Sequence, residues 1–346
     1  MTQKNTEKKS RLGYLDVLRA LAMLPVVAAH YIDALGSVGV TCPFNILPIK
    51  PFGVYLGNVG VSVFFIVSGA SLMCVYGGRK LQTGQYFKKR FLGILPMFWI
   101  AYIVAFVFFR AWNNFPGTEP WKAIFTLLGV DGYVMWITPT FYLLGEWFLG
   151  CIILLYLLFP LLKAGLEKKP YLTWGVVLLL WIVGPFVYEW KIPDEIFFLF
   201  RIPEFFFGMW FVSSGRKVKL PAFIAGVAGL ILLSVLNLDF IPTVYRNPFV
   251  GICLFLVIVW LCQNIKSNLF YKIFEVAGKH GYAVLLTHHL LVIYLVGRFA
   301  GQTFSAGKNF LVFGVYLAGV IVASAVLYQV NSLVVNIVAK KKYNLV

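Results

Sequence analysis

Apolar runs long enough to cross a membrane recur from one end of the sequence to the other. Of the 346 residues, 60% are hydrophobic and 12% are charged, whereas a typical soluble domain has about 25% charged residues. Runs of about twenty apolar residues match the length that a helix needs to cross the hydrocarbon core. The sequence therefore predicts an all-α, polytopic membrane protein.

We predict ten transmembrane helices in a single membrane domain (residues 1–346), with both termini in the cytoplasm. The predicted spans are 12–35, 54–77, 91–111, 146–165, 171–188, 196–214, 220–237, 248–265, 281–299 and 311–335. They form a bundle over 12–335, between cytoplasmic tails at 1–11 and 336–346. No segment between the spans is long enough for a soluble domain, so any chemistry takes place in the bundle or in its short loops.

The 30 Lys and Arg residues give a net charge of +17, and they are unevenly distributed between the loops. The segments predicted to be cytoplasmic hold 21 of them, the outward loops hold seven, and Arg19 and Arg201 lie within spans. This asymmetry is the positive-inside pattern. It excludes a nucleic-acid partner as the reason for the charge and leaves a secondary use in binding anionic membrane lipid or an anionic cytoplasmic ligand. We predict a multi-pass protein of the plasma or inner membrane.

The apolar segment 120–140 is interrupted by Gly129, Asp131, Gly132 and Pro139. If it crossed the membrane, the basic loop around Lys163–Lys169 would lie outside and every later loop would invert. The charge pattern therefore predicts that 120–140 is re-entrant or lies on the outer surface.

The first predicted span carries ionisable residues inside an apolar helix. Arg19 and His30 are eleven residues apart, which is about 1100° of helical rotation, or three turns plus about 20°. Both side chains therefore leave one face of the helix, about 16 Å apart along its axis. Ionisable groups at membrane depth nearly always face the bundle interior or a wet cavity. This face is expected to form one wall of a polar site.

His30 and Asp33 have the parts of an oriented general base. A carboxylate three residues away can fix the tautomer of the imidazole and stabilise the imidazolium as it takes up a proton. The alternative for His30 is a hydrogen bond to a backbone carbonyl at the end of the span. Arg19 suits a phosphate or carboxylate of a ligand that enters from the cytoplasm, and its alternative is a structural ion pair with Asp16.

Polar residues outside the first span are further candidates. Lys88, Lys89 and Arg90 lie just inside the membrane, where they suit the phosphates of a soluble cofactor or anionic lipid. Ser68 lies in a small-residue stretch that favours helix packing or a close approach to a ligand. Four residues are candidate substrate contacts: Glu146, Arg201, Glu204 and His288. Glu146 suits a helix cap equally well, and Arg201 and Glu204 could instead form a structural ion pair.

The adjacent residues His288 and His289 point about 100° apart on a helix, so at most one of them is expected to face the cavity of His30. Neither has a second ligand three or four residues away, and the five cysteines show no metal-binding spacing. We therefore predict no metal site.

These stretches resemble the acyltransferase 3 family of membrane-bound acyltransferases, and the resemblance covers nearly the whole chain. The most specific element is an arginine, ten residues and then a histidine in the first helix, here Arg19 and His30. Three shorter stretches are also similar to family patterns, in the family's order: FFIVSG at 64–69, RIPEF at 201–205, and a tyrosine followed six residues later by a histidine at 282–288.

One position departs from the family pattern. Many members carry an arginine three residues beyond the position of Arg90, where this chain has Gly93. We expect Lys88 and Lys89 to substitute for it.

The resemblance implies transfer of an acyl group, commonly acetyl, from cytoplasmic acyl-CoA to a hydroxyl of a cell-envelope glycan or lipid-linked sugar. The polyanionic coenzyme would bind at Arg19, Ser68, Lys89 and Arg90. His30 would take the proton of the acceptor hydroxyl or carry the acyl group itself, and Asp33 would orient it. The acceptor would contact the four residues named above as candidate substrate contacts.

Two other classes of function stay open from the sequence. A transporter or exporter of a glycan or small anion would use Arg19, Arg201, Glu204 and His288 as a substrate or proton path, although the lack of internal repeats disfavours it. A non-catalytic scaffold in a glycan-synthesis complex would not depend on His30. The oligomeric state is also open, a homo-oligomer included.

Overall fold

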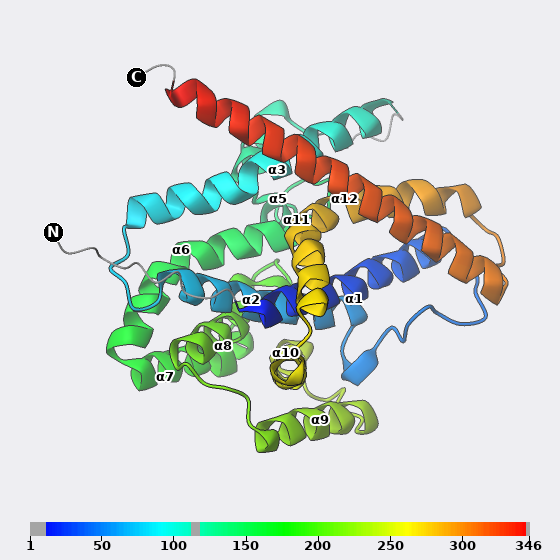
Figure 1. Cartoon of the computed structure of the whole chain (residues 1–346). Helices are drawn as coiled ribbons and strands as arrows, with labels where there is room; N and C mark the ends of the chain where they lie inside the picture. Colours follow the sequence, from blue (N-terminus) through cyan, green and yellow to red (C-terminus); the bar gives the residue numbers. More distant parts are fainter. Residues whose placement is uncertain (1–11, 112–117, 344–346) are drawn as a thin grey trace.

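The protein is described by a computed structural model for residues 12–111 and 118–343. Every named element in these ranges is a helix, which confirms the all-α prediction (Figure 1). The predicted tail 1–11 and the last three residues of the predicted tail 336–346 lie outside the described residues.

Ten helices of twelve or more residues correspond in order to the ten predicted spans. They are α1 (Gly13–Ser37), α2 (Leu56–Tyr76), α3 (Thr83–Ala111), α6 (Trp147–Lys168), α7 (Pro170–Val183), α8 (Ile202–Ser213), α9 (Leu220–Val235), α10 (Thr243–Asn264), α11 (Asn268–Val296) and α12 (Ala306–Tyr343). In the described ranges, seven of them are long and apolar enough to cross a membrane: α1, α2, α3, α6, α10, α11 and α12. The other three, α7, α8 and α9, have 14, 12 and 16 residues. Seven of the ten predicted spans are thus helices of full spanning length, and the other three are shorter helices at the predicted places.

Segment 120–140 forms short helical pieces, the longest of which are α4 (Ala123–Leu128) and α5 (Asp131–Val134). Gly129 ends α4 in the left-handed conformation, with φ +69°. Gly132 packs against the first turn of α6, where a Cβ would lie 2.1 Å from the Cα of Trp147. The segment is therefore not a single spanning helix.

Helix α2 lies at the centre of the bundle and packs closely against α1, α8 and α10. Glycines allow its closest approaches. A Cβ at Gly69 would lie 1.9 Å from the carbonyl oxygen of Phe205 on α8, and a Cβ at Gly208 of α8 would lie 1.9 Å from that of Ile66. The stretches 64–69 and 201–205, which resemble family patterns, thus meet where α2 packs against α8.

Helices α1 and α11 pack side by side and run in the same direction. Gly278 lies against Asp16, Gly281 against Met23, and His288 beside His30, in the same order along both helices. Beyond them, a parallel bridge between Thr41 and Thr303 ties the segment after α1 to the α11–α12 connection. Figure 1 shows both of these connections at the right of the bundle, while the α2–α3 and α6–α7 connections lie at the left.

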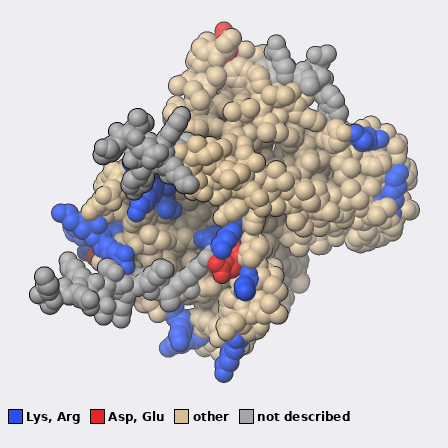
Figure 2. Space-filling view, turned by 45° about the horizontal axis from the view of Figure 1, so that its top comes forward, with Lys and Arg blue, Asp and Glu red and all other residues tan. Residues whose placement is uncertain are grey.

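Charged side chains are gathered in a few clusters on the face shown in Figure 2, and wide uncharged areas separate them. Large exposed apolar side chains are numerous on α3, α7, α9 and α12. Such a surface is what contact with lipid requires, because the hydrocarbon core penalises charged groups.

Candidate active site

A cavity of about 270 Å³ lies between α1, α2, α3, α6 and α11. Its lining includes all four residues predicted to bind the coenzyme: Arg19, Ser68, Lys89 and Arg90. The rest of the lining mixes tyrosines and apolar groups: Met23, Phe64, Gly93, Ile94, Phe148, Ile152, Tyr156, Gly281, Tyr282 and Leu285. The cavity is thus cationic near Lys89 and Arg90 and largely apolar towards Met23 on α1, Phe148 on α6 and Leu285 on α11.

Arg19 is held in place on the wall of this cavity. Its guanidinium donates to the carboxylate of Asp16 at 2.8 Å and to the hydroxyl of Ser71 on α2. The Asp16 pair that we considered as an alternative is therefore present. The side chain still keeps 30% of its surface exposed, so its charge is available to a ligand in the cavity.

Arg90 has no carboxylate partner in the described ranges. Its Nε is buried with no hydrogen-bond partner there, and its guanidinium lies 5.7 Å from the centre of the Tyr76 ring. Lys89 beside it is exposed. At Gly93 a Cβ would meet nothing within 4 Å, so the position where many family members carry arginine faces open space. This end of the cavity fits an anionic ligand.

Three imidazole rings meet further along α1 and α11. The centre of the His30 ring lies 5.0 Å from that of His288 and 5.2 Å from that of His289. Both adjacent histidines therefore lie beside His30, which their spacing on one helix did not suggest, and none of the three lines the cavity of Arg19. Their side chains leave α11 in different directions, but His30 comes from a neighbouring parallel helix and lies between them.

His288 is fixed in one tautomer by its backbone contact. Its Nδ1 lies 3.0 Å from the carbonyl oxygen of Val284, which can only accept, so Nδ1 carries the proton in the neutral ring. Its Nε2 is then an acceptor, buried and without a hydrogen-bond partner in the described structure. His289 likewise has a buried, unpartnered Nδ1, and its ring packs against Gly145. Unpartnered buried nitrogens beside His30 leave room for proton exchange or for a substrate hydroxyl.

The histidines lie beyond the cavity, in the direction leading away from Lys89 and Arg90. On α1 the lining runs from Arg19 to Met23, and His30 follows two turns later. On α11 it ends at Leu285, with His288 less than one turn beyond. A ligand that enters among the cations therefore points towards the imidazoles.

Among the described residues, no hydrogen bond or ion pair joins Asp33 to His30. The carboxylate of Asp33 is exposed and accepts a hydrogen bond from the hydroxyl of Tyr55, next to the start of α2. Residues three apart on a helix can contact each other, so the spacing allows an interaction with His30. The carboxylate instead bonds to Tyr55, which lies beyond the end of the first span. The role of Asp33 in orienting His30 stays a prediction.

Arg201 and Glu204 form a buried ion pair away from the cavity. Their N–O distance is 3.0 Å, and their side chains are 2% and 0% exposed. Arg201 also donates to the carbonyl oxygen of Glu195 and lies 3.5 Å from the hydroxyl of Ser62. Neither residue lines the cavity of Arg19, so this geometry favours the structural alternative that ties α8 to α2.

Glu146 holds the loop that leads into α6. Its carboxylate accepts hydrogen bonds from the backbone amides of Leu143 and Leu144, at 3.2 and 2.6 Å. Both amides precede α6, and the side chain makes no hydrogen bond to the first turn of that helix, so the capping role considered as its alternative is not observed. The preceding residue, Gly145, packs against the ring of His289. The loop that Glu146 holds therefore touches the histidine cluster.

The residue that sequence reasoning missed is His289. Its proximity to His30 depends on the register of α1 against α11, which no local pattern encodes. Among the described residues, no group of three His, Cys, Asp or Glu side chains is arranged to hold a metal ion.

Both comparisons that give a match point to acyl transfer. A family described as an acyltransferase domain matches residues 12–329. Acyltransferase MdmB of Streptomyces mycarofaciens is 29% identical over 168 residues, which cover 46% of this chain and 41% of that protein. The chain thus matches less than half the length of this curated relative. No solved structure matches.

Proposed function

The chain belongs to the acyltransferase 3 family, and on that premise we propose that it transfers an acyl group, most simply acetyl, from acyl-CoA to a hydroxyl. The acceptor in this proposal is a glycan of the cell envelope or a lipid-linked sugar. The donor enters from the cytoplasm, and the protein acts in the plasma or inner membrane.

The observation that carries the proposal is the cavity that joins Arg19, Lys89 and Arg90 and leads towards His30. Pockets for drug-sized ligands enclose about 300–1,000 Å³, so a cavity of about 270 Å³ suits part of a coenzyme, such as its thiol arm. The cations and the buried, unpartnered Nε of Arg90 suit the phosphates. The residues present therefore fit acyl-CoA, which supplies the activated thioester.

His30 then has the chemistry to activate the acceptor. A sugar hydroxyl has a high pKa, so its attack on a thioester requires a base that removes its proton. His30 takes this proton as the hydroxyl attacks the thioester, or it attacks the thioester itself and passes the acyl group on. In either route the carbon–sulfur bond of the thioester breaks, and coenzyme A leaves as a thiol that takes up the proton of the acceptor hydroxyl. His288 and His289 lie beside it as proton partners.

The test uses purified protein in lipid with labelled acetyl-CoA and an envelope glycan fraction. We expect the wild type to label the glycan and His30→Ala to lose transfer by about 100- to 10,000-fold, the usual contribution of a general base. The same variant should keep its affinity for acetyl-CoA, because His30 does not line the cavity.

Two outcomes would contradict the proposal. If the wild type does not bind acetyl-CoA at all, a transporter of a glycan or small anion becomes the better account. If His30→Ala transfers acetyl at the wild-type rate, the imidazole is not part of the reaction.

A further inference from the structure

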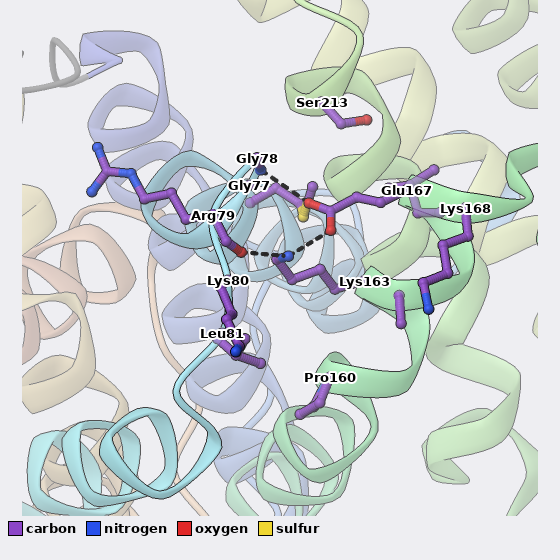
Figure 3. A pocket seen from close by; sticks show the side chains of 13 residues that line it. Gly77, Gly78, Arg79, Lys80, Leu81, Pro160, Lys163, Glu167, Lys168 and Ser213 are labelled. Atoms are coloured by element: carbon purple, nitrogen blue, oxygen red, sulfur yellow. Dashed lines mark hydrogen bonds and ion pairs between the residues drawn. The ribbon is translucent and has the colours of Figure 1, made fainter.

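A second hollow lies at the opposite end of α2 from Tyr55 and is separate from the active-site cavity. It encloses about 790 Å³ between the α2–α3 connection, the last turns of α6 and the end of α8. The segments that bound it are the ones predicted to be cytoplasmic. Figure 3 shows the connection at 77–81 on one side of it and α6 on the other.

Internal hydrogen bonds hold this hollow in shape. The ammonium of Lys163 is buried and donates to the carbonyl oxygen of Arg79 at 3.0 Å and to the carboxylate of Glu167 at 2.6 Å. The same carboxylate accepts a hydrogen bond from the backbone amide of Gly78 at 2.9 Å. These bonds tie the α2–α3 connection to α6 (Figure 3).

The lining carries an excess of positive charge. Glu167 is the one acidic residue among the described residues that line the hollow, and Lys163 already neutralises it. Arg79, Lys80 and Lys168 have no carboxylate partner in the described ranges. In Figure 3 the ammonium groups of Lys80 and Lys168 flank the hollow, whereas the guanidinium of Arg79 points away from Glu167.

An aromatic partition separates this hollow from the active-site cavity. Tyr86 is 1% exposed, and its ring lies 5.2 Å from that of Tyr76 and 5.3 Å from that of Phe159. Its hydroxyl also donates to the carbonyl oxygen of Tyr156, which lines the cavity. The two sites share no lining residue.

Much of the remaining lining is apolar, and an exposed leucine follows it in the sequence. Met73, Leu81 and Pro160 line the hollow, and next to Pro160 the side chain of Leu161 is 70% exposed. Apolar side chains offer no favourable contact to a soluble anion. A phospholipid, by contrast, presents a phosphate next to acyl chains that can pack against them. Anionic lipids are abundant in cytoplasmic leaflets and attract basic side chains at this level.

We infer that this hollow binds the headgroup phosphate of an anionic phospholipid from the cytoplasmic leaflet, with Lys80 and Lys168 as its main ligands. The inference does not depend on acyl transfer. Bound lipid would brace the α2–α3 connection, from which α3 carries Lys89 and Arg90 to the active-site cavity.

The test compares two double variants that each remove two exposed lysines from the basic segments. Lys80→Gln with Lys168→Gln changes the hollow, and Lys217→Gln with Lys219→Gln is the control, since those lysines lie in the α8–α9 connection outside the lining. Lipid-depleted protein in detergent is titrated with phosphatidylglycerol, phosphatidylcholine or adenosine 3′,5′-bisphosphate, and native mass spectrometry counts the bound molecules.

We expect the hollow variant to bind phosphatidylglycerol about 25-fold more weakly, at about fivefold for each lysine near an anionic lipid. The control should keep the wild-type affinity, and phosphatidylcholine should bind both variants equally. An equal loss in the control, or no loss in either variant, would overturn the site. Binding of the bisphosphate that depends on Lys80 and Lys168, without such dependence for phosphatidylglycerol, would overturn the lipid as its ligand.

Discussion

Three imidazoles lie together in the bundle, and the proposed chemistry depends on them. His288 donates through Nδ1 to a backbone carbonyl and keeps a free acceptor nitrogen. His30 has ring neighbours on both sides at about 5 Å, and Asp33 is occupied by Tyr55. The partners of His30 in proton transfer are therefore expected to be the histidines rather than the carboxylate.

At this scale we predict that His289→Asn lowers the turnover number without changing the affinity for the acyl donor. The turnover number should fall by about tenfold or more. This is less than the 100- to 10,000-fold contribution of a general base, because His289 assists His30 rather than replacing it. Steady-state kinetics with acetyl-CoA measure both quantities.

The matched control is His280→Asn, on the same helix. Its Nδ1 bonds to the carbonyl four residues earlier, as that of His288 does, but its ring contacts Tyr328 rather than His30. It should retain wild-type turnover. Equal losses in the two variants would mean that the effect of His289 is only structural.

At the scale of helices, close contacts of α2 determine where the site residues stand. Ser68 lines the cavity, and the next residue, Gly69, sits against the backbone of α8. The buried pair joins Arg201, the residue before α8, to Glu204 in the first turn of that helix. These two family-like stretches therefore act as one packing unit behind the cavity.

We predict that Gly69→Ala or Gly208→Ala destabilises the protein. Each new methyl would have to displace a carbonyl that lies 1.9 Å from the ideal Cβ position, and overpacking of this kind costs about 1–3 kcal/mol. The melting temperature in detergent should fall. Gly314→Ala on α12 is the control, since its Cβ meets nothing within 4 Å, and better helix propensity stabilises it by up to about 1 kcal/mol. A fall in both variants alike would contradict the close-contact argument.

The helices and the cationic end of the site could be predicted from the sequence because they depend on local patterns. Apolar runs give the spans, and eleven residues between Arg19 and His30 give a shared face. The partners across helices could not be predicted. The approach of His289 to His30, of Tyr55 to Asp33 and of Gly69 to Phe205 each depends on which helices pack together and in what register.

At the scale of the whole molecule, the proposal needs the cations of the cavity to face the cytoplasm. The positive-inside pattern predicts that the α2–α3 and α6–α7 connections lie there, and the α2–α3 connection and the last turns of α6 line the second hollow together. Segment 120–140 forms short helices instead of a single spanning helix, as expected if these two connections lie on one side.

We predict that single cysteines at Lys80 and Lys169, introduced into a cysteine-free protein, react with an impermeant reagent only from the cytoplasmic side. A cysteine at Lys191 should react only from the outside, because α7 lies between it and Lys169. Labelling of intact cells and inverted vesicles reads this out. If the cysteine at position 169 reacts from the outside, segment 120–140 crosses the membrane and the orientation of the later helices is inverted.

The measurement that tests the account most directly is the position of a bound acyl-CoA thioether analogue, determined by cryo-electron microscopy of the protein in lipid nanodiscs. The account predicts its phosphates beside Lys89 and Arg90, with its thiol arm passing Arg19 towards His30 and His288. An analogue bound in the hollow between Lys80 and Lys168, with the cavity beside Arg19 left empty, would contradict it.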